Sequence, residues 1–286
     1  MFRLAFANAA ETFERVRDPL AERGIHVEAV SASHGAFSLS DPPVDPSRYD
    51  AGYVFPGRLM EGDVLDTWLD VPWLNGRDAV LTSRNKAGVL ATLERAGIPV
   101  PETVLVSNPA DTTDLEDAYA AIDSPVVVKP NSTTRGVGVA KAADLDSFLG
   151  ITDYLDLVHD YRATDDRSFL VQEYVPDARD YRVMVLDGEV VGTVERRLPE
   201  SAIEAGRWKH NVHRGADAVA ADPSPEVRDL AERTAAALDI RFLGVDVLET
   251  EERVLVNETN ARPTIDDEKK YDEGFYDRLA AAVKSL

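Results

Sequence analysis

Eight short apolar segments between residues 103 and 260 constrain the fold of this chain more than any other feature of its sequence. Each is rich in residues with high β-propensity and ends at polar or glycine-bearing residues, as β-strands do. The segments are 103–106, 126–129, 138–140, 169–174, 181–186, 189–196, 242–249 and 253–260. Two helical stretches, 144–159 and 224–238, lie among them. Because strands and helices do not alternate here, the order predicts an α+β arrangement for this part of the chain.

The N-terminal part follows another pattern. Phe2–Ala7 and Ile25–Val30 have the composition of strands, and Ala10–Gly24 between them has helical spacing and ends on glycine. A strand, a helix and a strand of these lengths predict a βαβ unit on a parallel sheet. A loop rich in proline and aspartate, 31–50, then leads to a further strand at Ala51–Phe55. Residues 1–78 are therefore predicted to form a small α/β domain.

The composition excludes several classes of protein. The 286 residues include no cysteine, which excludes disulfides, thiolate metal sites and cysteine nucleophiles. The net charge is -21, with seven lysines against twenty-four arginines, which is typical of a solvated surface in a high-salt cytoplasm. Such a surface repels polyphosphates, so we expect no nucleic-acid or anionic-membrane partner. No apolar run reaches the length of a membrane span, and Arg3 and Glu11 come too early for a signal peptide, so we expect a cytoplasmic location.

The segment 125–140, PVVVKPNSTTRGVGVA, contains the first candidate site. Three valines predict a buried strand that ends at Lys129, and the polar, glycine-bearing stretch Asn131–Gly138 follows before a strand resumes. A loop with free N–H groups and hydroxyls can bind a triphosphate, on which Lys129 would place a positive charge. An ordinary hairpin with a polar turn explains the pattern equally well.

The segment 242–260 contains the second candidate site. Asp246 interrupts an apolar strand, and Glu258 and Asn260 end the next strand, two residues apart and therefore on one face. Three hard oxygen donors favour Mg²⁺ or Mn²⁺ over zinc. The alternative is a solvated Glu258 at a strand end and an Asp246 that caps a turn.

The register between these two strands depends on the turn that joins them. A three-residue turn at 251–253 would pair Glu249 with Leu255. The same register places Asp246 opposite Glu258. Two facing carboxylates repel each other unless a cation lies between them, which favours the metal interpretation.

The third candidate site is a hairpin predicted over 180–197, with Asp187–Gly188 as its two-residue turn. The register set by this turn places Arg182, Glu195 and Arg197 at the open end of one face. Such a cluster could hold phosphate oxygens. A salt-bridged, solvated sheet face is the alternative.

The fourth candidate site is the loop 207–215, RWKHNVHRG, which is cationic in an otherwise acidic chain. Its basic residues are Arg207, Lys209 and Arg214. This contrast with the background charge favours local anion binding. His210 and His213 have no third ligand nearby in the sequence, so we do not expect a zinc site.

A helix is predicted from Ser83 to Ala96, with Ser83 as its N-cap and Gly97 as its stop. Lys86 lies in the first turn, where the helix dipole disfavours a cation. Either a bound anion or simple solvation explains this position.

Taken in order and spacing, these motifs resemble the ATP-grasp superfamily and, within it, the RimK-like ligases, over about residues 84–284. The motifs are SRNK (83–86), VVVKP (126–130), VQEYV (171–175), DYR and ERR (180–182 and 195–197), NVHRG (211–215), GVDVL (244–248) and NETNARP (257–263). The resemblance implies an α/β (α+β) ATP-grasp fold preceded by a pre-ATP-grasp βαβ domain. It divides the chain into the N-terminal domain at 1–78, a central subdomain at 79–172 and a C-terminal subdomain at 173–286.

The resemblance also implies roles for single residues. The expected nucleotide contacts are Lys86, Lys129, Glu173, Tyr174, Asp180, Lys209, His210 and Asn211. The expected ligands of Mg²⁺ or Mn²⁺, with two ions in the site, are Asp246, Glu258 and Asn260. Arg197 and Arg214 are expected to steady the transferred phosphoryl group and the acyl phosphate.

The activity implied is that of an ATP-dependent carboxylate–amine ligase. A carboxylate attacks the γ-phosphorus of ATP to give an acyl phosphate and ADP, and an amine then displaces phosphate to form an amide. The amine would be an amino acid such as glutamate, and the acceptor a protein tail, a carrier or a small molecule. Whether the chain forms a homo-oligomer stays open. The alternatives to ligase activity are a phosphotransferase and a non-catalytic nucleotide-binding module.

Two positions depart from the pattern of the relatives. After Asn260 the relatives commonly continue with Ser-Pro-Gly, whereas this chain continues with Ala261–Arg262–Pro263–Thr264. Arg135 lies in the glycine-bearing loop, where relatives often have a small or amide residue. Both changes lie on the substrate side, so the identity of the acceptor is left open. Arg262 could indicate an acidic substrate.

Overall fold

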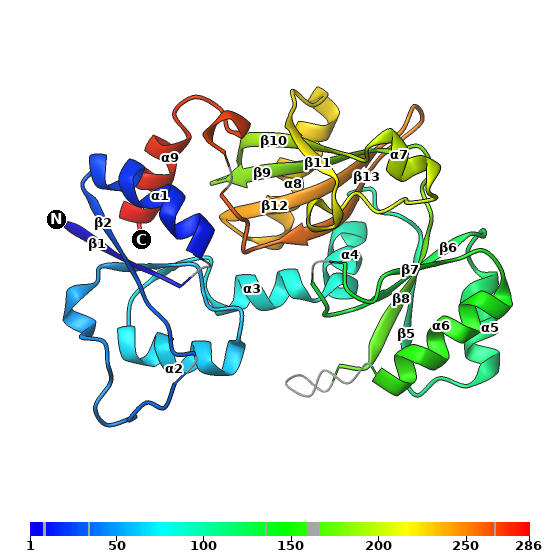
Figure 1. The fold of residues 1–286 in the computed structure, drawn as a ribbon, viewed down its shortest axis with the longest axis horizontal. Helices are drawn as coiled ribbons and strands as arrows, with labels where there is room; N and C mark the ends of the chain where they lie inside the picture. The colour runs from blue at the N-terminus through cyan, green and yellow to red at the C-terminus, as the bar shows by residue number, and fades with distance from the viewer. Residues whose placement is uncertain (8–9, 34, 135, 159–165, 266) are drawn as a thin grey trace.

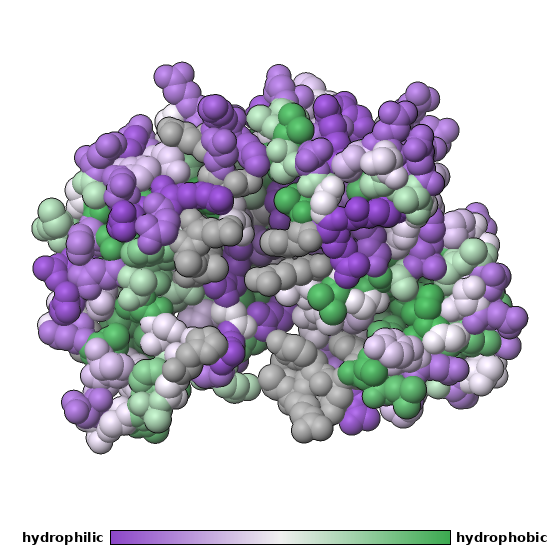
Figure 2. Space-filling model, viewed as in Figure 1, coloured by the Kyte–Doolittle hydropathy of each residue, from purple (hydrophilic) through white to green (hydrophobic). Residues whose placement is uncertain are grey.

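The structure is a computed structural model that describes residues 1–286 except 8–9, 34, 135, 159–165 and 266. The described residues form three β-sheets with helices packed against them (Figure 1). The mixed α/β class predicted from the sequence is confirmed. None of the helices in this part of the chain is long and apolar enough to cross a membrane. Figure 2 shows hydrophilic side chains spread over this face, with smaller apolar patches between them.

The N-terminal sheet is parallel, with strand order β2-β1-β3-β4. Its elements are β1 (Phe2–Phe6), α1 (Ala10–Glu22), β2 (Ile25–Ala29), η1 (Pro46–Arg48), β3 (Ala51–Tyr53), α2 (Leu59–Leu69) and β4 (Trp73–Leu74). The predicted βαβ unit is confirmed, because β1 and β2 are parallel neighbours joined by α1. Leu4 and Phe6 face α1, whereas Ala5 between them faces α2, as the alternation of side chains along a strand requires.

The central sheet is antiparallel, with strand order β5-β8-β6-β7. Its elements are β5 (Thr103–Ser107), α5 (Thr112–Ala120), β6 (Val126–Pro130), β7 (Ala140–Ala142), α6 (Leu145–Val158) and β8 (Ser168–Glu173). Val126, Val128 and Phe169 pack with residues of α5 and α6 in a core of their own. The three-valine strand predicted to be buried is therefore the middle of this core.

The C-terminal sheet has five strands in the order β11-β10-β9-β12-β13. Its elements are β9 (Arg179–Leu186), β10 (Glu189–Arg197), α7 (Glu200–Glu204), η2 (Val212–Arg214), β11 (Asp217–Ala220), α8 (Pro225–Leu238), β12 (Phe242–Glu249), β13 (Val254–Asn260), η3 (Glu268–Lys270) and α9 (Phe275–Lys284). One face of the sheet packs against α8. The opposite face meets the N-terminal sheet at one end and forms the wall of a cavity at the other.

The helix predicted over 83–96 is two helices. They are α3 (Arg77–Arg84) and α4 (Lys86–Arg95), and Asn85 breaks the chain between them. Asn85, and not Ser83, is the N-cap of α4, because its side chain accepts a hydrogen bond from Gly88 N at 3.0 Å. Lys86 lies in the first turn, as predicted. Because α4 packs with α8 on the C-terminal sheet, the segment after residue 79 contributes to the C-terminal core, and the domain boundaries stay predictions.

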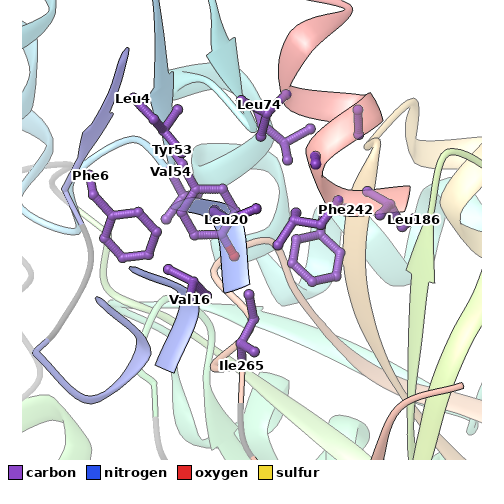
Figure 3. Packing of buried hydrophobic residues seen from close by; sticks show 14 of the residues in the cluster. Leu4, Phe6, Val16, Leu20, Tyr53, Val54, Leu74, Leu186, Phe242 and Ile265 are labelled. Atoms are coloured by element: carbon purple, nitrogen blue, oxygen red, sulfur yellow. The ribbon is translucent and has the colours of Figure 1, made fainter. Parts of the chain in front are cut away.

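A single apolar core joins the N-terminal sheet to the C-terminal sheet (Figure 3). The Tyr53 ring stacks on Phe6 with centroids 4.8 Å apart and lies 6.3 Å from Phe242 of β12. The C-terminal helix α9 adds Phe275, whose ring lies 6.3 Å from that of Phe242. Burying each such side chain contributes about 1.5–3 kcal/mol, so this core holds the two sheets firmly together.

The β9–β10 hairpin begins in the predicted register. Leu186 pairs with Glu189, and Asp187 and Gly188 have φ values of 50° and 84°, as a type I′ turn requires. The register then shifts by one residue in the stretch 190–192, which is a β-bulge.

The bulge exchanges the two faces of β10 beyond it. Arg182 pairs with Val194, so Arg182 shares its face with Arg196. Glu195 and Arg197 lie on the opposite face. The prediction that Arg182, Glu195 and Arg197 cluster on one face is therefore wrong, because the register of β10 beyond the bulge is displaced by one residue.

The predicted pairing of β12 with β13 is wrong next to the turn, and a second bulge restores it at Asp246. Glu249 pairs with Val254 rather than with Leu255. The pairing then shifts by one residue next to Asp246, so Asp246 lies opposite Glu258, as predicted. The two carboxylates face each other because of a bulge that the sequence pattern did not reveal.

Candidate active site

A cavity of about 450 Å³ lies between the central and C-terminal sheets. The predicted nucleotide and metal residues that line it are Lys129, Glu173, Tyr174, Asp180, Lys209, His210, Asn211, Asp246 and Glu258. Its apolar lining residues are Val127, Val139, Val175, Leu198, Ile203, Trp208 and Leu248. Apolar walls with a set of convergent charged groups are typical of a site for a small ligand.

Asp246 is the most heavily ion-paired acid of the cavity. Its two carboxylate oxygens accept hydrogen bonds from Arg182 Nε at 2.7 Å and Arg182 Nη2 at 2.8 Å, and Arg196 Nη1 lies 3.0 Å away. Burial alone would raise the pKa of Asp246, but the two guanidinium groups outweigh it and hold the pKa below its ordinary value. The Asp246 carboxylate is therefore ionised in its buried position.

Arg196 connects Asp246 to Asp180. Its Nε donates a hydrogen bond to Asp180 Oδ1 at 2.9 Å, and His210 Nδ1 lies 3.8 Å from Asp180 Oδ2. Burial raises the pKa of Asp180, against the opposing effect of Arg196. Arg196 was missed by the sequence reasoning, because the undetected bulge directed attention to Arg197.

Arg197 lies outside the cavity. It pairs with Glu195 at 2.6 Å, and Arg179 binds the same carboxylate at 3.0 Å. Hydrogen bonds from Arg179 and then Arg197 lower the pKa of Glu195 to about 2. Arg214 is exposed and is not part of the lining, so its predicted role in phosphoryl transfer stays a prediction.

The two predicted phosphate lysines are both buried. Lys129 Nζ donates to Asn257 Oδ1 at 2.8 Å and to Gln172 Oε1. Lys86 Nζ donates to the carbonyl oxygen of Asn131 at 3.2 Å and lies 3.5 Å from Glu258 Oε1. Asn257 and Gln172 stand within motifs quoted from the sequence, but nothing in the pattern singled them out.

The predicted phosphate loop is anchored at its start by Asn131. Asn131 Oδ1 accepts a hydrogen bond from Ala87 N at 2.9 Å, and its Nδ2 donates to Asn85 Oδ1 at 3.0 Å. Ser132 Oγ is buried and has no hydrogen-bond partner among the described residues. Arg135, singled out in the sequence, lies outside the described residues.

The basic loop meets the phosphate loop across the cavity. Lys209 Nζ donates to the carbonyl oxygen of Val139. Gly136 has a φ of 65°, and a Cβ there would lie 3.0 Å from Asn211 Oδ1, so the two loops are in close contact. The side chain of His213, considered in the sequence as a zinc ligand together with His210, lies outside the described part of the structure.

The predicted nucleotide contacts Glu173 and Tyr174 have different surroundings. The Glu173 carboxylate accepts hydrogen bonds from Arg253 Nη1 at 3.0 Å and from Glu102 N at 2.9 Å, so it joins β8 to the turn between β12 and β13. Tyr174 packs edge-on against Trp208 at 5.8 Å, and Lys141 Nζ lies 4.3 Å from the Tyr174 ring centre. The Glu173 carboxylate is thus bound to protein groups, and the Tyr174 side chain is the one that shapes the cavity.

The predicted metal ligands are compatible with a hard divalent cation. Asp246 and Glu258 face each other on adjacent strands, and Asn260 pairs with Gly244 on the same face. Asn260 Oδ1 accepts a hydrogen bond from Arg262 N at 2.9 Å. Within the described ranges no three His, Asp or Glu residues gather around one point, and both Asp246 oxygens bind guanidinium groups, so the metal assignment of Asp246, Glu258 and Asn260 stays a prediction.

The arrangement of the three sheets is that of an ATP-grasp fold. The solved structures with a similar fold include a RimK domain ATP-grasp protein from Sphaerobacter thermophilus, with a TM-score of 0.68, 23% identity and coverage of 99% of both chains. A D-cycloserine synthetase has a TM-score of 0.75 at 17% identity, over 98% of this chain and 99% of that one.

The family follows from the sequence comparison. The model of the RimK-like ATP-grasp domain matches residues 83–275, so the chain belongs to that family. A probable alpha-L-glutamate ligase of Citrobacter koseri is 34% identical over 206 residues, which cover 69% of this chain and 62% of the relative. A ribosomal protein bS6–L-glutamate ligase of Escherichia coli is 34% identical over 202 residues, 68% of this chain and 60% of the relative. The chain thus spans about 60% of the length of these relatives.

If Lys129 contacts the phosphates as predicted, nucleotide affinity should fall at alkaline pH. Burial lowers the pKa of Lys129 to about 8, and a bound phosphate favours its charged form. We expect the affinity for ATP to decline as pH rises through 8, by up to about tenfold per pH unit, in calorimetric titrations. Lys129→Arg, whose guanidinium stays charged, should flatten this alkaline limb. A wild-type affinity that does not change above pH 8 contradicts the prediction.

Proposed function

We propose that the chain is an ATP-dependent carboxylate–amine ligase that forms an amide through an acyl phosphate. The observation that carries the proposal is that Lys129 and the facing pair Asp246–Glu258 line one cavity, with Lys86 3.5 Å from Glu258. Positive groups for phosphates and oxygen ligands for a divalent cation are the two requirements of phosphoryl transfer from ATP. Membership of the RimK-like family supports the same conclusion.

The residues of the chain would position charge rather than supply a nucleophile. Lys129 and Lys86 bind the phosphates of ATP, and Tyr174, Trp208 and the apolar lining enclose the base. Asp246, Glu258 and Asn260 would hold Mg²⁺ or Mn²⁺, which neutralises the phosphate charge when bound. Arg182 and Arg196 fix the Asp246 carboxylate in place.

The reaction needs two displacements. A substrate carboxylate oxygen attacks the γ-phosphorus and the bond to the β-phosphate oxygen breaks, which gives ADP and an acyl phosphate. The amine nitrogen then attacks the acyl carbon, phosphate leaves, and the amine loses a proton. Closing the phosphate loop over the cavity would keep water away from the acyl phosphate.

The names of the curated relatives suggest glutamate as the amine substrate. We propose an amino acid of this kind as the amine, and a protein tail, a carrier or a small molecule as the acceptor.

Hydroxylamine distinguishes this proposal from its main rival. The acyl phosphate of a ligase is trapped as a hydroxamate, whereas a phosphotransferase that phosphorylates a hydroxyl group gives ADP and no hydroxamate. We expect ADP release with hydroxamate formation when amino acids and candidate carboxylates are screened with ATP and Mg²⁺. ADP release without hydroxamate favours the phosphotransferase. ATP binding without ADP release across the panel favours a non-catalytic module.

A further inference from the structure

The outer strand β5 of the central sheet has a free edge. It stands at the end of the strand order and pairs with β8 alone. Glu173 N donates a hydrogen bond to Glu102 O at 2.9 Å, and hydrogen-bonded pairs alternate along antiparallel strands. The backbone N–H and C=O groups of Thr103, Leu105 and Ser107 therefore point outward, where none of the described residues pairs with them. Such a row of groups is a template for one more strand.

The sequence of β5 does not discourage the pairing of another strand. Its five residues, TVLVS, include no charged residue and no proline, and the Leu105 side chain is 53% exposed. Natural proteins usually protect outer strands by shortness, charge or cover. The other outer strands of the described sheets are protected in these ways: β4 and β7 have two and three residues, β2 contains Glu28, β11 contains Asp217, and Val256 N of β13 donates to Pro99 O.

A groove of about 360 Å³ lies beside this edge, between β5 and α5, and we call it the β5 groove. Val104, Val106 and Ala118 give it an apolar floor, and Asp114 and Asp117 line it as well. Figure 1 shows α5 on the outer side of the central sheet. The β5 groove shares no lining residue with the nucleotide cavity, so it is a separate feature of the described structure.

The surroundings of the β5 groove are acidic. No lysine, arginine or histidine stands between Arg95 and Lys129 in the sequence, whereas six acidic residues do. Asp114 and Asp117 belong to this stretch, and both are exposed. We propose that the edge of β5 and the β5 groove bind an extended basic segment of a partner protein, which adds an outer strand to the central sheet.

The alternation of side chains along a strand defines the sequence that fits. Side chains on the α5 side of the added strand enter the β5 groove, where the stems of lysine or arginine cover the apolar floor and their charged ends reach Asp114 and Asp117. Side chains on the other side lie beside Leu105, which favours apolar residues. The partner segment therefore alternates basic and apolar residues.

A second copy of this chain fits the same edge less well. Residues 96–128 contain no basic side chain, and each copy has a net charge of -21. Two copies that met along β5 would bring their acidic residues together and repel each other. The edge therefore selects a chain of opposite charge.

Labelled peptides test the inference on the full chain by fluorescence anisotropy. Acetyl-VKVKVKV-amide can place its lysines in the β5 groove and its valines beside Leu105, whereas acetyl-VEVEVEV-amide has the same pattern with the opposite charge. We expect the lysine peptide to bind at least about tenfold more tightly, because like charges oppose the glutamate peptide.

A third peptide separates strand addition from attraction between a cationic peptide and an acidic chain. In an antiparallel pair the valine opposite Leu105 exchanges both backbone hydrogen bonds with it. Methylating the valine nitrogens removes these bonds and keeps the charge of the lysine peptide. We expect the methylated peptide to bind at least about tenfold more weakly, as the loss of two or more hydrogen bonds implies.

Two variants and a matched control locate the site. Leu105→Lys places a charge on the exposed edge, as natural outer strands do, and should weaken the lysine peptide at least about tenfold. Asp117→Asn removes one charge from the β5 groove and should weaken it about threefold. Asp153→Asn removes the same charge from an exposed position on α6, outside the β5 groove, and should leave the affinity unchanged.

The inference goes beyond the proposed function and does not depend on it, because the binding measurements need no turnover. Undetectable binding of the lysine peptide, equal affinity for its methylated form, or undiminished affinity in both Leu105→Lys and Asp117→Asn would each overturn the inference. A wild-type dimer that Leu105→Lys converts to a monomer in sedimentation experiments would assign the edge to a second copy and would overturn it as well.

Discussion

Replacing Glu258 by alanine should abolish ATP turnover while the fold stays intact. Glu258 lies opposite Asp246, and the pair is the acidic centre that we propose holds the divalent cation beneath the phosphates. Losing a group that stabilises developing charge costs about 10²–10³-fold in rate even where other donors remain, and losing a metal ligand costs at least as much. The measurement is ADP release at saturating ATP and ordinary Mg²⁺.

A matched control uses the neighbouring exposed acid Glu251, which lies in the turn between β12 and β13. Glu251→Ala should keep full activity. Glu258→Ala should unfold at nearly the same urea concentration as wild-type protein, because the Glu258 side chain is 35% exposed. Turnover by Glu258→Ala at ordinary Mg²⁺ would remove the metal assignment.

Replacing Arg196 by methionine should destabilise the protein by about 3–5 kcal/mol, since it leaves buried carboxylates without their shared partner. Arg196 binds Asp180 and Asp246 together, and its side chain is only 9% exposed. The measurement is the free energy of unfolding in urea at neutral pH. The loss should shrink in acid, because protonated Asp180 no longer needs a cation, and burial already raises the pKa of that carboxyl group.

The neighbouring residue Arg197 provides the control variant. Its side chain is 57% exposed and pairs with Glu195 on the other face of the sheet. Arg197→Met should change the free energy of unfolding by less than about 1 kcal/mol. Equal losses for the two variants, or a larger loss for Arg197→Met, would contradict the register that the bulge in β10 imposes.

These two arginines also show what the sequence could predict of the site. Periodicity places residues on faces only while a strand stays regular, and a single bulge exchanges the faces beyond it. In β10 the bulge made the predicted placement of Arg197 on the same face as Arg182 wrong. In β12 and β13 the bulge compensated for a misjudged turn, so Asp246 and Glu258 meet as predicted. In β10 the glycine at 192 stands at the bulge, and a glycine inside a strand is a local sign of one that the sequence analysis did not use. The bulge in β13 has no such local sign.

The strands were easier to predict than several helices. The apolar runs at 126–130 and 242–249 are buried strands, as their composition indicates. Helices α2, α5 and α9 were not predicted, although α9 packs into the largest core. Local pattern says little about such helices, since most of their stability comes from packing against a distant sheet. The break at Asn85 was missed for a related reason, because helix formers stand on both sides of it.

The way the three sheets are joined determines which of them can move. The N-terminal and C-terminal sheets share one continuous apolar core, through contacts such as Tyr53 with Phe242. The central sheet has a separate core, and the contacts that tie Lys129 to Asn257 and Glu173 to Arg253 are polar. Water can replace polar contacts at small cost, whereas opening an apolar core exposes its whole surface. We therefore expect substrate entry to proceed by rotation of the central sheet alone, while the N-terminal and C-terminal sheets move together as one rigid unit.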